Sequence, residues 1–327
     1  MLNNLFKKGF IIGIILLFIS AGVLPSLGGK DIDKYSKIKY EIESNSDWYY
    51  LKSYPNYAPH GLPDFNQTQQ YDWKNIDNHN DCCGATCLAN IFWWFDSKNE
   101  DSNGYPGDGF DNYSLVQIYH SEDNCTPGPL PDDHNYNNVN DLDTPYYQWR
   151  NTGELIEKIA WYTNRQKDSI IIQSLPNFFI TIFNAFKLCY GAKKWICKNN
   201  LCDDFSVITV IKPDFNCIDK CVRQNKGVIV GFAVLDESED VDWGHFVSVA
   251  GINSNGFIAL SDPVWDKENY SESSIEHNNP YYVSHDIYEI NFTTPLPFLS
   301  SWCIPDYAGK HLGVVEFALI ISQKENQ

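Results

Sequence analysis

Basic residues are scarce in this sequence. Its 327 residues include 24 lysines and arginines but 42 aspartates and glutamates, a net charge of −18. Proteins bind a nucleic-acid backbone through clustered lysine and arginine, so this balance argues against nucleic acid as a partner. The GxxxxGK[ST] and GxGxxG phosphate-binding loops and the HExxH helix of zinc peptidases are also missing, and no internal repeat is visible. Nucleotide-loop enzymes, zincins and repeat proteins are therefore excluded as starting points.

The first 29 residues differ from the rest of the chain. Lys7 and Lys8 precede an uncharged, mostly apolar run that continues to Gly29. This order is typical of an export signal, and we interpret residues 1–29 as a signal peptide. The run is nearly long enough to span a bilayer, so membrane anchoring through residues 10–29 is the alternative. Both interpretations place the remaining chain outside the cytoplasm, secreted or anchored at the cell surface, where disulfides persist.

The order of the expected elements predicts an α+β protein. A lead-in segment at 30–60 precedes one domain at 61–327, with helices first and an antiparallel sheet after them. A short strand and turn are expected at 63–67, and a polar turn at 195–205. One helix is expected to begin at Gly84. Three further helices are expected at Asn151–Asn164, Asn177–Tyr190 and Phe215–Gln224. The expected strands are the β-branched and aromatic runs Val228–Leu235, Phe246–Ile252, Phe257–Leu260 and Val314–Ile321.

The ten cysteines favour disulfides over a metal site. Cys197, Cys202, Cys217 and Cys221 are four candidates for a zinc site, but their Cys-x4-Cys and Cys-x3-Cys spacings are not those of zinc knuckles. Export favours bridges between them, with a connectivity that the sequence leaves open. We therefore expect neither a metal nor another cofactor.

The stretch that begins at Cys83 predicts a buried central helix with a cysteine in its first turn. Leu88, Phe92 and Phe95 recur at helical spacing in a run that is almost wholly apolar. Unpaired N–H groups and the positive end of the helix dipole favour a thiolate at such a position. Because the thiolate is the nucleophilic form, Cys83 is a candidate for covalent catalysis.

Two neighbouring cysteines compete with Cys83 for this role. Cys87 lies one turn into the helix, where fewer N–H groups are unpaired, so we expect it to be buried or bridged. Cys82 is adjacent to Cys83, and such a pair allows one bridged and one free cysteine. In a chain with ten cysteines any single one is more often bridged than catalytic, so the assignment depends on partners elsewhere.

Two polar residues in the last third are suitable partners. His245 opens an apolar strand, and Asp262 ends the next strand, just before Pro263. The intervening Asn-Ser-Asn-Gly turn at 253–256 fits a hairpin, which would bring the two side chains together. A thiol needs a base to lower its pKa, and the histidine needs an acceptor on its second nitrogen. Alone, His245 would be interpreted as a strand-edge residue and Asp262 as a turn cap; together with Cys83 they favour catalysis.

Four short motifs then occur in an order that resembles the papain-like cysteine peptidases: Gln67, Cys83-Gly84, Gly244-His245 and Asp262-Pro263. They are similar to those of the double-glycine, bacteriocin-processing branch, although Ala85 stands where that branch has proline; papain-type enzymes lack this proline too. Segments 89–98 and 283–288 further resemble exported archaeal and bacterial proteins of this type. The resemblance covers residues 60–322.

The resemblance implies a two-lobe papain-like fold, with the cysteine helix in an N-terminal helical lobe and an antiparallel sheet in a C-terminal lobe. It also implies a peptide or protein substrate and a thioester intermediate. Cys83 would be the nucleophile, His245 its base, Asp262 the group that orients the histidine, and Gln67 a donor to the oxyanion.

Two other functions are compatible with the same sequence. The ten cysteines, the long Tyr- and Asn-rich loop at about 98–148 and the lack of a visible pro-segment also suit a non-catalytic binding module on this fold. A transglutaminase-like acyl transferase would use the same three residues.

Overall fold

The computed structural model describes a discontinuous set of residues, all within the unit that runs from Ser46 to Gln327. The described residues are 48–54, 58, 61–65, 82–99, 115–116, 155–156, 159–160, 162–163, 177–235, 241–265, 286–292, 302–309 and 311–324. The predicted signal or anchor at 1–29 and the predicted oxyanion donor Gln67 lie outside them.

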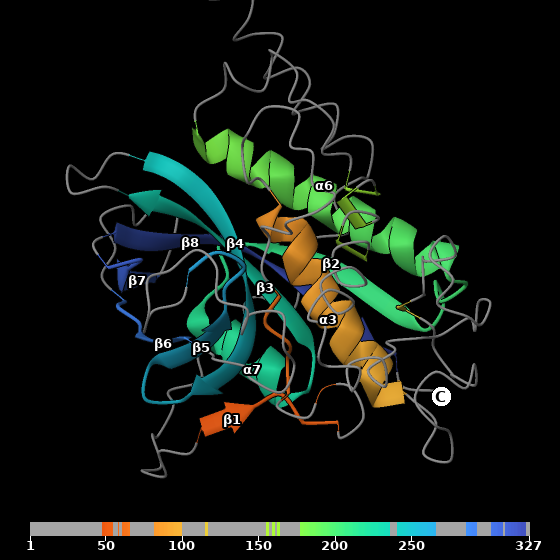
Figure 1. Ribbon diagram of the computed structural model, residues 1–327. Coiled ribbons are helices and arrows are strands. Elements are labelled where there is room, and N and C mark those ends of the chain that lie inside the picture. Colours follow the sequence, from red (N-terminus) through yellow and green to blue (C-terminus); the bar gives the residue numbers. More distant parts are fainter. Residues whose placement is uncertain are drawn as a thin grey trace, which may run out of the picture. The chain divides into compact units, whose positions relative to one another are not determined.

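The described elements are mixed, which confirms the α+β class (Figure 1). In chain order they are β1 (Trp48–Tyr50), α3 (Cys83–Asn99), α6 (Asn177–Lys198), β2 (Phe205–Ile211), α7 (Phe215–Arg223), β3 (Gly227–Leu235), β4 (Val241–Asn253), β5 (Phe257–Ser261), β6 (Asp286–Glu289), β7 (Cys303–Tyr307) and β8 (His311–Gln323). The strands form one eight-stranded sheet in the order β2-β8-β3-β4-β5-β6, with β1 paired to β4 and β7 paired to β8. Every pairing is antiparallel.

The centre of the sheet is β3, which pairs with β4 on one side and β8 on the other. All nine of its residues are buried, so both of its faces are covered. Such a strand carries no alternation of polar and apolar residues, and it appears in the sequence as the continuous run GVIVGFAVL. The strand predicted at Val228–Leu235 is therefore confirmed as β3.

The hairpin expected between β4 and β5 is present. Residues 248–253 of β4 pair with residues 257–261 of β5. In the turn, the Gly256 N–H donates to the Asn253 carbonyl at 3.1 Å, and the Asn255 N–H donates to the Asn253 side chain at 2.8 Å. Gly256 has φ +90°, a conformation that glycine adopts without steric cost.

Helices α3 and α6 pack on this sheet and on each other (Figure 1). The rings of Phe92 in α3 and Trp195 in α6 stack at 6.5 Å between centroids. Close approach depends on glycine at two points. A Cβ on Gly84 would lie 3.1 Å from Leu188 of α6, and one on Gly227 would lie 2.5 Å from Ile91 of α3. The backbones of α3, α6 and β3 are therefore held close together.

The expected end of α6 at Tyr190 was wrong, and the turn expected at 195–205 is confined to residues 199–204. The helix continues to Lys198, and the strand β2 begins at Phe205. Gly191, directly after Tyr190, lies inside the helix, and a Cβ there would meet the backbone of Thr163 at 2.7–2.8 Å. The glycine thus serves a close contact between segments, and the buried Trp195 holds the last turns on the core.

Two N-terminal expectations also differ from the structure. Residues 63–65 form no strand; their polar groups bond to α3 and β5 instead. Within the predicted lead-in at 30–60, β1 pairs with β4, so this segment contributes a strand to the sheet.

The predicted helix at 151–164 lies mostly outside the described residues, although Leu155, Ile159 and Tyr162 are helical. No helix among the described residues is both long and apolar enough to cross a membrane.

The described cysteines divide into one bridged pair and several thiols. Cys197 and Cys202 form a disulfide between the end of α6 and the start of β2, as the preference for bridges predicts. Cys217 and Cys221, four residues apart on α7, are not bridged. Among the described residues no cluster of three or more His, Cys, Asp or Glu side chains is placed to hold a metal ion.

Candidate active site

The thiol of Cys83 lies at the start of the central helix. Cys83 is the first residue of α3, only 6% of its surface is exposed, and it is not in a disulfide. The Thr86 N–H and hydroxyl both donate to the Cys82 carbonyl, at 2.9 and 3.0 Å, which fixes the first turn. The N–H groups of residues 83–85 precede the first intrahelical bond, so they and the helix dipole create a positive potential at the thiol.

His245 reaches this thiol from the sheet. It lies in β4 opposite Phe232 of β3, and it is 2% exposed. Its Nε2 lies 2.9 Å from Oδ1 of Asp262, which directly follows β5. A hydrogen bond also joins the His245 and Cys83 side chains. Because Nε2 contacts Asp262, Nδ1 is the ring nitrogen left for the thiol, and His245 links the sulfur to the carboxylate.

Asp262 is a fully paired buried carboxylate. Besides the histidine, its Oδ1 accepts the Val264 and Trp265 N–H groups at 2.9 and 3.1 Å. Its Oδ2 accepts the hydroxyl of Tyr307, a buried residue of β7. Buried charges are tolerated when hydrogen bonds satisfy their oxygens, as they do here. The orientation of His245 is thus set by a carboxylate that is itself fixed from two sides.

The surroundings of His245 and Asp262 favour the charged form of both side chains. Burial alone would lower the pKa of His245, but the Asp262 charge, its hydrogen bond and the contact with Cys83 outweigh burial and raise the pKa to about 10. Burial opposes ionisation of Asp262 too, yet its pKa is lowered because of the charge and hydrogen bond of His245 and the bonds from Tyr307 and Val264. An imidazolium beside a thiol stabilises the thiolate, so this arrangement suits a nucleophilic sulfur.

The raised pKa of His245 predicts a loss of stability at alkaline pH. The imidazole titrates at 6.5 when unperturbed and at about 10 here, so the folded state retains a proton that the unfolded state has released. The stability from this proton is complete below about pH 6.5 and is lost as the pH rises through about 10. We expect the free energy of unfolding, measured in urea across this window, to fall further for the wild type than for His245→Gln. Parallel curves would contradict the shift.

The segment that leads to Gln67 is anchored beside the same site. The Ser261 hydroxyl lies 2.6 Å from the Pro63 carbonyl and 2.8 Å from Oδ1 of the buried Asp64. From α3, Asn90 donates to the Ser261 hydroxyl at 3.3 Å and accepts the Phe65 N–H at 3.0 Å. Residues 63–65 are therefore tied both to α3 and to Ser261, the residue that precedes Asp262. They end two positions before Gln67.

The competing cysteines have different surroundings. Cys87 is completely buried, and its thiol donates to the Phe246 carbonyl at 3.2 Å. Burial, followed by the proximity of Cys83, raises its pKa well above the ordinary value, so it remains a neutral thiol. The expectation that Cys87 is buried is confirmed. Cys82 is also buried and unbridged, and it precedes the helix.

Several residues around the site were missed from the sequence. Asn90 had a detectable signal, because it is a polar residue within the apolar run of α3 and its burial requires partners. Asp64 and Ser261 are short polar residues next to a proline and an aspartate, which resembles ordinary turn chemistry. Tyr307 had no local signal, because its role depends on how β7 meets the residue that follows β5.

Comparisons with known proteins add no assignment to this geometry. No protein-family model matches the chain. No curated protein shows significant sequence similarity to it. The functional argument therefore depends on the residues around Cys83 themselves.

Proposed function

We propose that the protein is an exported cysteine peptidase with a papain-like, two-lobe arrangement. The observation that carries the proposal is the double contact of His245, which bonds to Asp262 through one ring nitrogen and to the Cys83 side chain as well. A nucleophile, a base within hydrogen-bond reach and a third group that orients the base are the parts that acyl transfer through sulfur requires.

The geometry supports the following sequence of steps. The Cys83 thiolate attacks the carbonyl carbon of a peptide bond, and the carbonyl oxygen becomes an oxyanion. The first-turn N–H groups of α3 and the Gln67 side chain would stabilise this charge, each donor contributing about 3 kcal/mol in known cases. The His245 imidazolium then donates its proton to the leaving amine. Water, deprotonated by His245, hydrolyses the thioester and restores the thiolate.

A thiol-directed peptidyl electrophile tests this assignment directly. We expect one adduct per chain, located by mass spectrometry on the peptide that contains Cys83, because this sulfur has an imidazolium partner. The same sample, digested without reduction, shows whether Cys83 is bridged. An adduct elsewhere, or a disulfide at Cys83, would disprove the nucleophile assignment, and a disulfide would favour the non-catalytic binding module.

The transglutaminase-like alternative uses the same three residues and differs in what resolves the thioester. A primary amine offered together with a peptide substrate would be incorporated by an acyl transferase, whereas a peptidase releases the free acid. We expect hydrolysis to exceed amine incorporation. The reverse ratio, measured by mass spectrometry of the products, would reassign the reaction class but retain the roles of Cys83 and His245.

A further inference from the structure

Two thiols contact each other on α7, outside the proposed active site. Cys217 and Cys221 are four residues apart on this helix, and neither is in a disulfide. A hydrogen bond joins their side chains, with the Cys217 thiol as the donor. Cys221 is buried, whereas Cys217 is only half-buried, so solvent reaches the pair from the Cys217 side. The two sulfurs therefore offer a pair of soft donors near the surface of the protein.

The ordinary role of a cysteine in a helix is that of a small apolar residue of the core. This role suits Cys221, which lies on the buried face of α7 with Ile218 and Val222. It does not account for Cys217, whose partial burial gains little, or for the hydrogen bond between the two thiols. A ligand that uses both sulfurs would account for both observations.

The geometry of the helix disfavours a disulfide between these residues. Residues four apart on a helix have Cβ atoms about 5–6 Å apart. A disulfide needs Cβ atoms about 3.5–4.5 Å apart, so closing one would distort α7. The Cys197–Cys202 bridge lies instead where α6 ends, with Cα atoms 4.5 Å apart. A metal ion held in line by two sulfurs spans about 4.6 Å, if each bond has the length of about 2.3 Å found in zinc thiolates.

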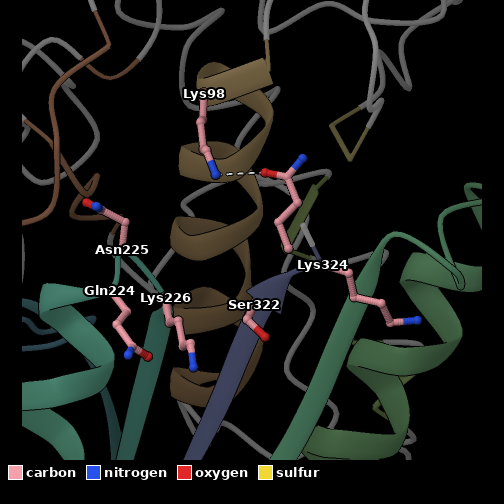
Figure 2. A pocket seen from close by; sticks show the side chains of 7 residues that line it. Lys98, Gln224, Asn225, Lys226, Ser322 and Lys324 are labelled. Carbon is pink, nitrogen blue, oxygen red and sulfur yellow. Dashed lines mark hydrogen bonds between the residues drawn. The ribbon is translucent and has the colours of Figure 1, made fainter. Parts of the chain in front are cut away.

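The charges near Cys221 favour a negatively charged sulfur. Lys226 and Lys220 both lower the pKa of Cys221, in addition to the hydrogen bond from Cys217, which has the largest effect and outweighs burial. Lys226 lies in the turn between α7 and β3, at the edge of the pocket drawn in Figure 2. Asp214 at the start of α7 has the opposite effect and contributes to the raised pKa of Cys217. The positive charges therefore act on the buried sulfur, and the half-buried sulfur retains its proton.

We propose that Cys217 and Cys221 together bind one soft monovalent metal ion, Cu(I) or Ag(I). Thiolates select such ions over harder cations. The described residues contain no group of three or more His, Cys, Asp or Glu side chains that could hold a metal ion. Zinc takes four ligands, whereas a monovalent ion of this class is satisfied by two sulfurs in line. The ion takes the place of the proton that the two sulfurs share, and this proton is released to solvent.

This site differs from the zinc site considered from the sequence. That site would have needed Cys197 and Cys202, which are bridged to each other. The remaining pair has too few ligands for zinc but the right number for Cu(I) or Ag(I). A complex of one monovalent ion with two thiolates carries one negative charge, which the nearby Lys226 and Lys220 stabilise.

Anaerobic titration of the full chain with Cu(I), in competition with the coloured chelator bicinchoninate, tests the site. Native mass spectrometry of the same samples counts the bound ions. We expect Cys217→Ser and Cys221→Ser each to lose one tightly bound ion, with an affinity lowered by about 10²-fold or more, because a second linked donor adds about 10²- to 10⁴-fold. The control is Cys189→Ser, at a buried thiol of α6, which should bind as the wild type does.

Two results would overturn the proposal. One is an unchanged affinity and number of bound ions in Cys217→Ser. This variant keeps the start of α7, since Asp214 accepts the backbone N–H of residue 217 at 2.6 Å, so it tests the site even if Cys221→Ser destabilises the core. The other is a Cys217–Cys221 disulfide in a digest of the freshly prepared protein without reduction, which would identify a redox pair instead.

The metal site and the proposed peptidase can fail separately. Cys83→Ala removes the proposed nucleophile and should retain the ion at Cys217 and Cys221. Cys217→Ser should lose this ion and retain hydrolysis, because α7 contributes none of the residues placed in the active site.

Discussion

Replacing Cys83 by alanine is expected to reduce peptide hydrolysis by about 10⁴- to 10⁶-fold, as removal of an attacking side chain does in enzymes with such a triad. The fold should persist, because the change removes one sulfur atom and leaves the helix start intact. Loss of free energy of unfolding should be about 1 kcal/mol, at the low end for the removal of a buried group. Steady-state hydrolysis and urea unfolding of the same preparation measure both effects.

The matched controls are the two cysteines that compete for the nucleophile role. Cys82→Ala and Cys87→Ala should each retain hydrolysis within a few-fold, since Cys87 is a neutral thiol bonded to a backbone carbonyl. A double variant, Cys83→Ala with His245→Ala, should lose no more activity than Cys83→Ala alone, because residues that act as a unit are not additive. Full activity in Cys83→Ala would exclude the mechanism, and loss in Cys82→Ala would transfer the nucleophile to that residue.

Replacing Asp262 by alanine is expected to impair both stability and activity. The variant leaves His245 buried without its anionic partner, and it removes the carboxylate that accepts from the Tyr307 hydroxyl and from the Val264 and Trp265 N–H groups. Breaking a buried ion pair from one side costs about 3–5 kcal/mol of unfolding free energy. Catalytic efficiency should fall about 10⁴-fold, as it does when a triad carboxylate is neutralised.

Asp262→Asn separates the two effects. Its amide oxygen can still accept the backbone N–H groups, so it should be more stable than Asp262→Ala, but it lacks the charge that holds the His245 proton. Hydrolysis should therefore remain low while the urea midpoint recovers in part. If Asp262→Asn restored activity as well as stability, the carboxylate charge would have no role and the raised pKa of His245 would need another cause.

Much of the site could be predicted because its signals are local. The apolar run after Cys83 indicates a buried helix through its periodicity, and position within that helix fixes the potential at the sulfur. The turn at 253–256 defines a hairpin, and antiparallel pairing then brings His245 near Asp262. Each of these inferences spans fewer than about 20 residues, a distance over which backbone geometry dominates.

The remainder depended on contacts between distant segments. Tyr307 of β7 meets Asp262, which follows β5, through a sheet in which β7 pairs with β8, β8 with β3, β3 with β4 and β4 with β5. Likewise, Gly191 of α6 lies against the backbone of Thr163, a contact between two segments that the sequence does not pair. No pattern within one segment encodes such meetings, since they follow from the order of strands in the sheet.

By itself, the sequence determined the acidic net charge, the α+β class, the buried helix that starts at Cys83 and the hairpin that carries His245 and Asp262. Composition, periodicity and turn chemistry act over short stretches, so they can be evaluated without a fold. Only the tertiary structure decided that the sulfur at position 83 meets the imidazole at 245, that Cys197 pairs with Cys202, and that Tyr307 completes the carboxylate. The physical reason is that packing and strand order select these partners from many chemically equivalent candidates along the chain.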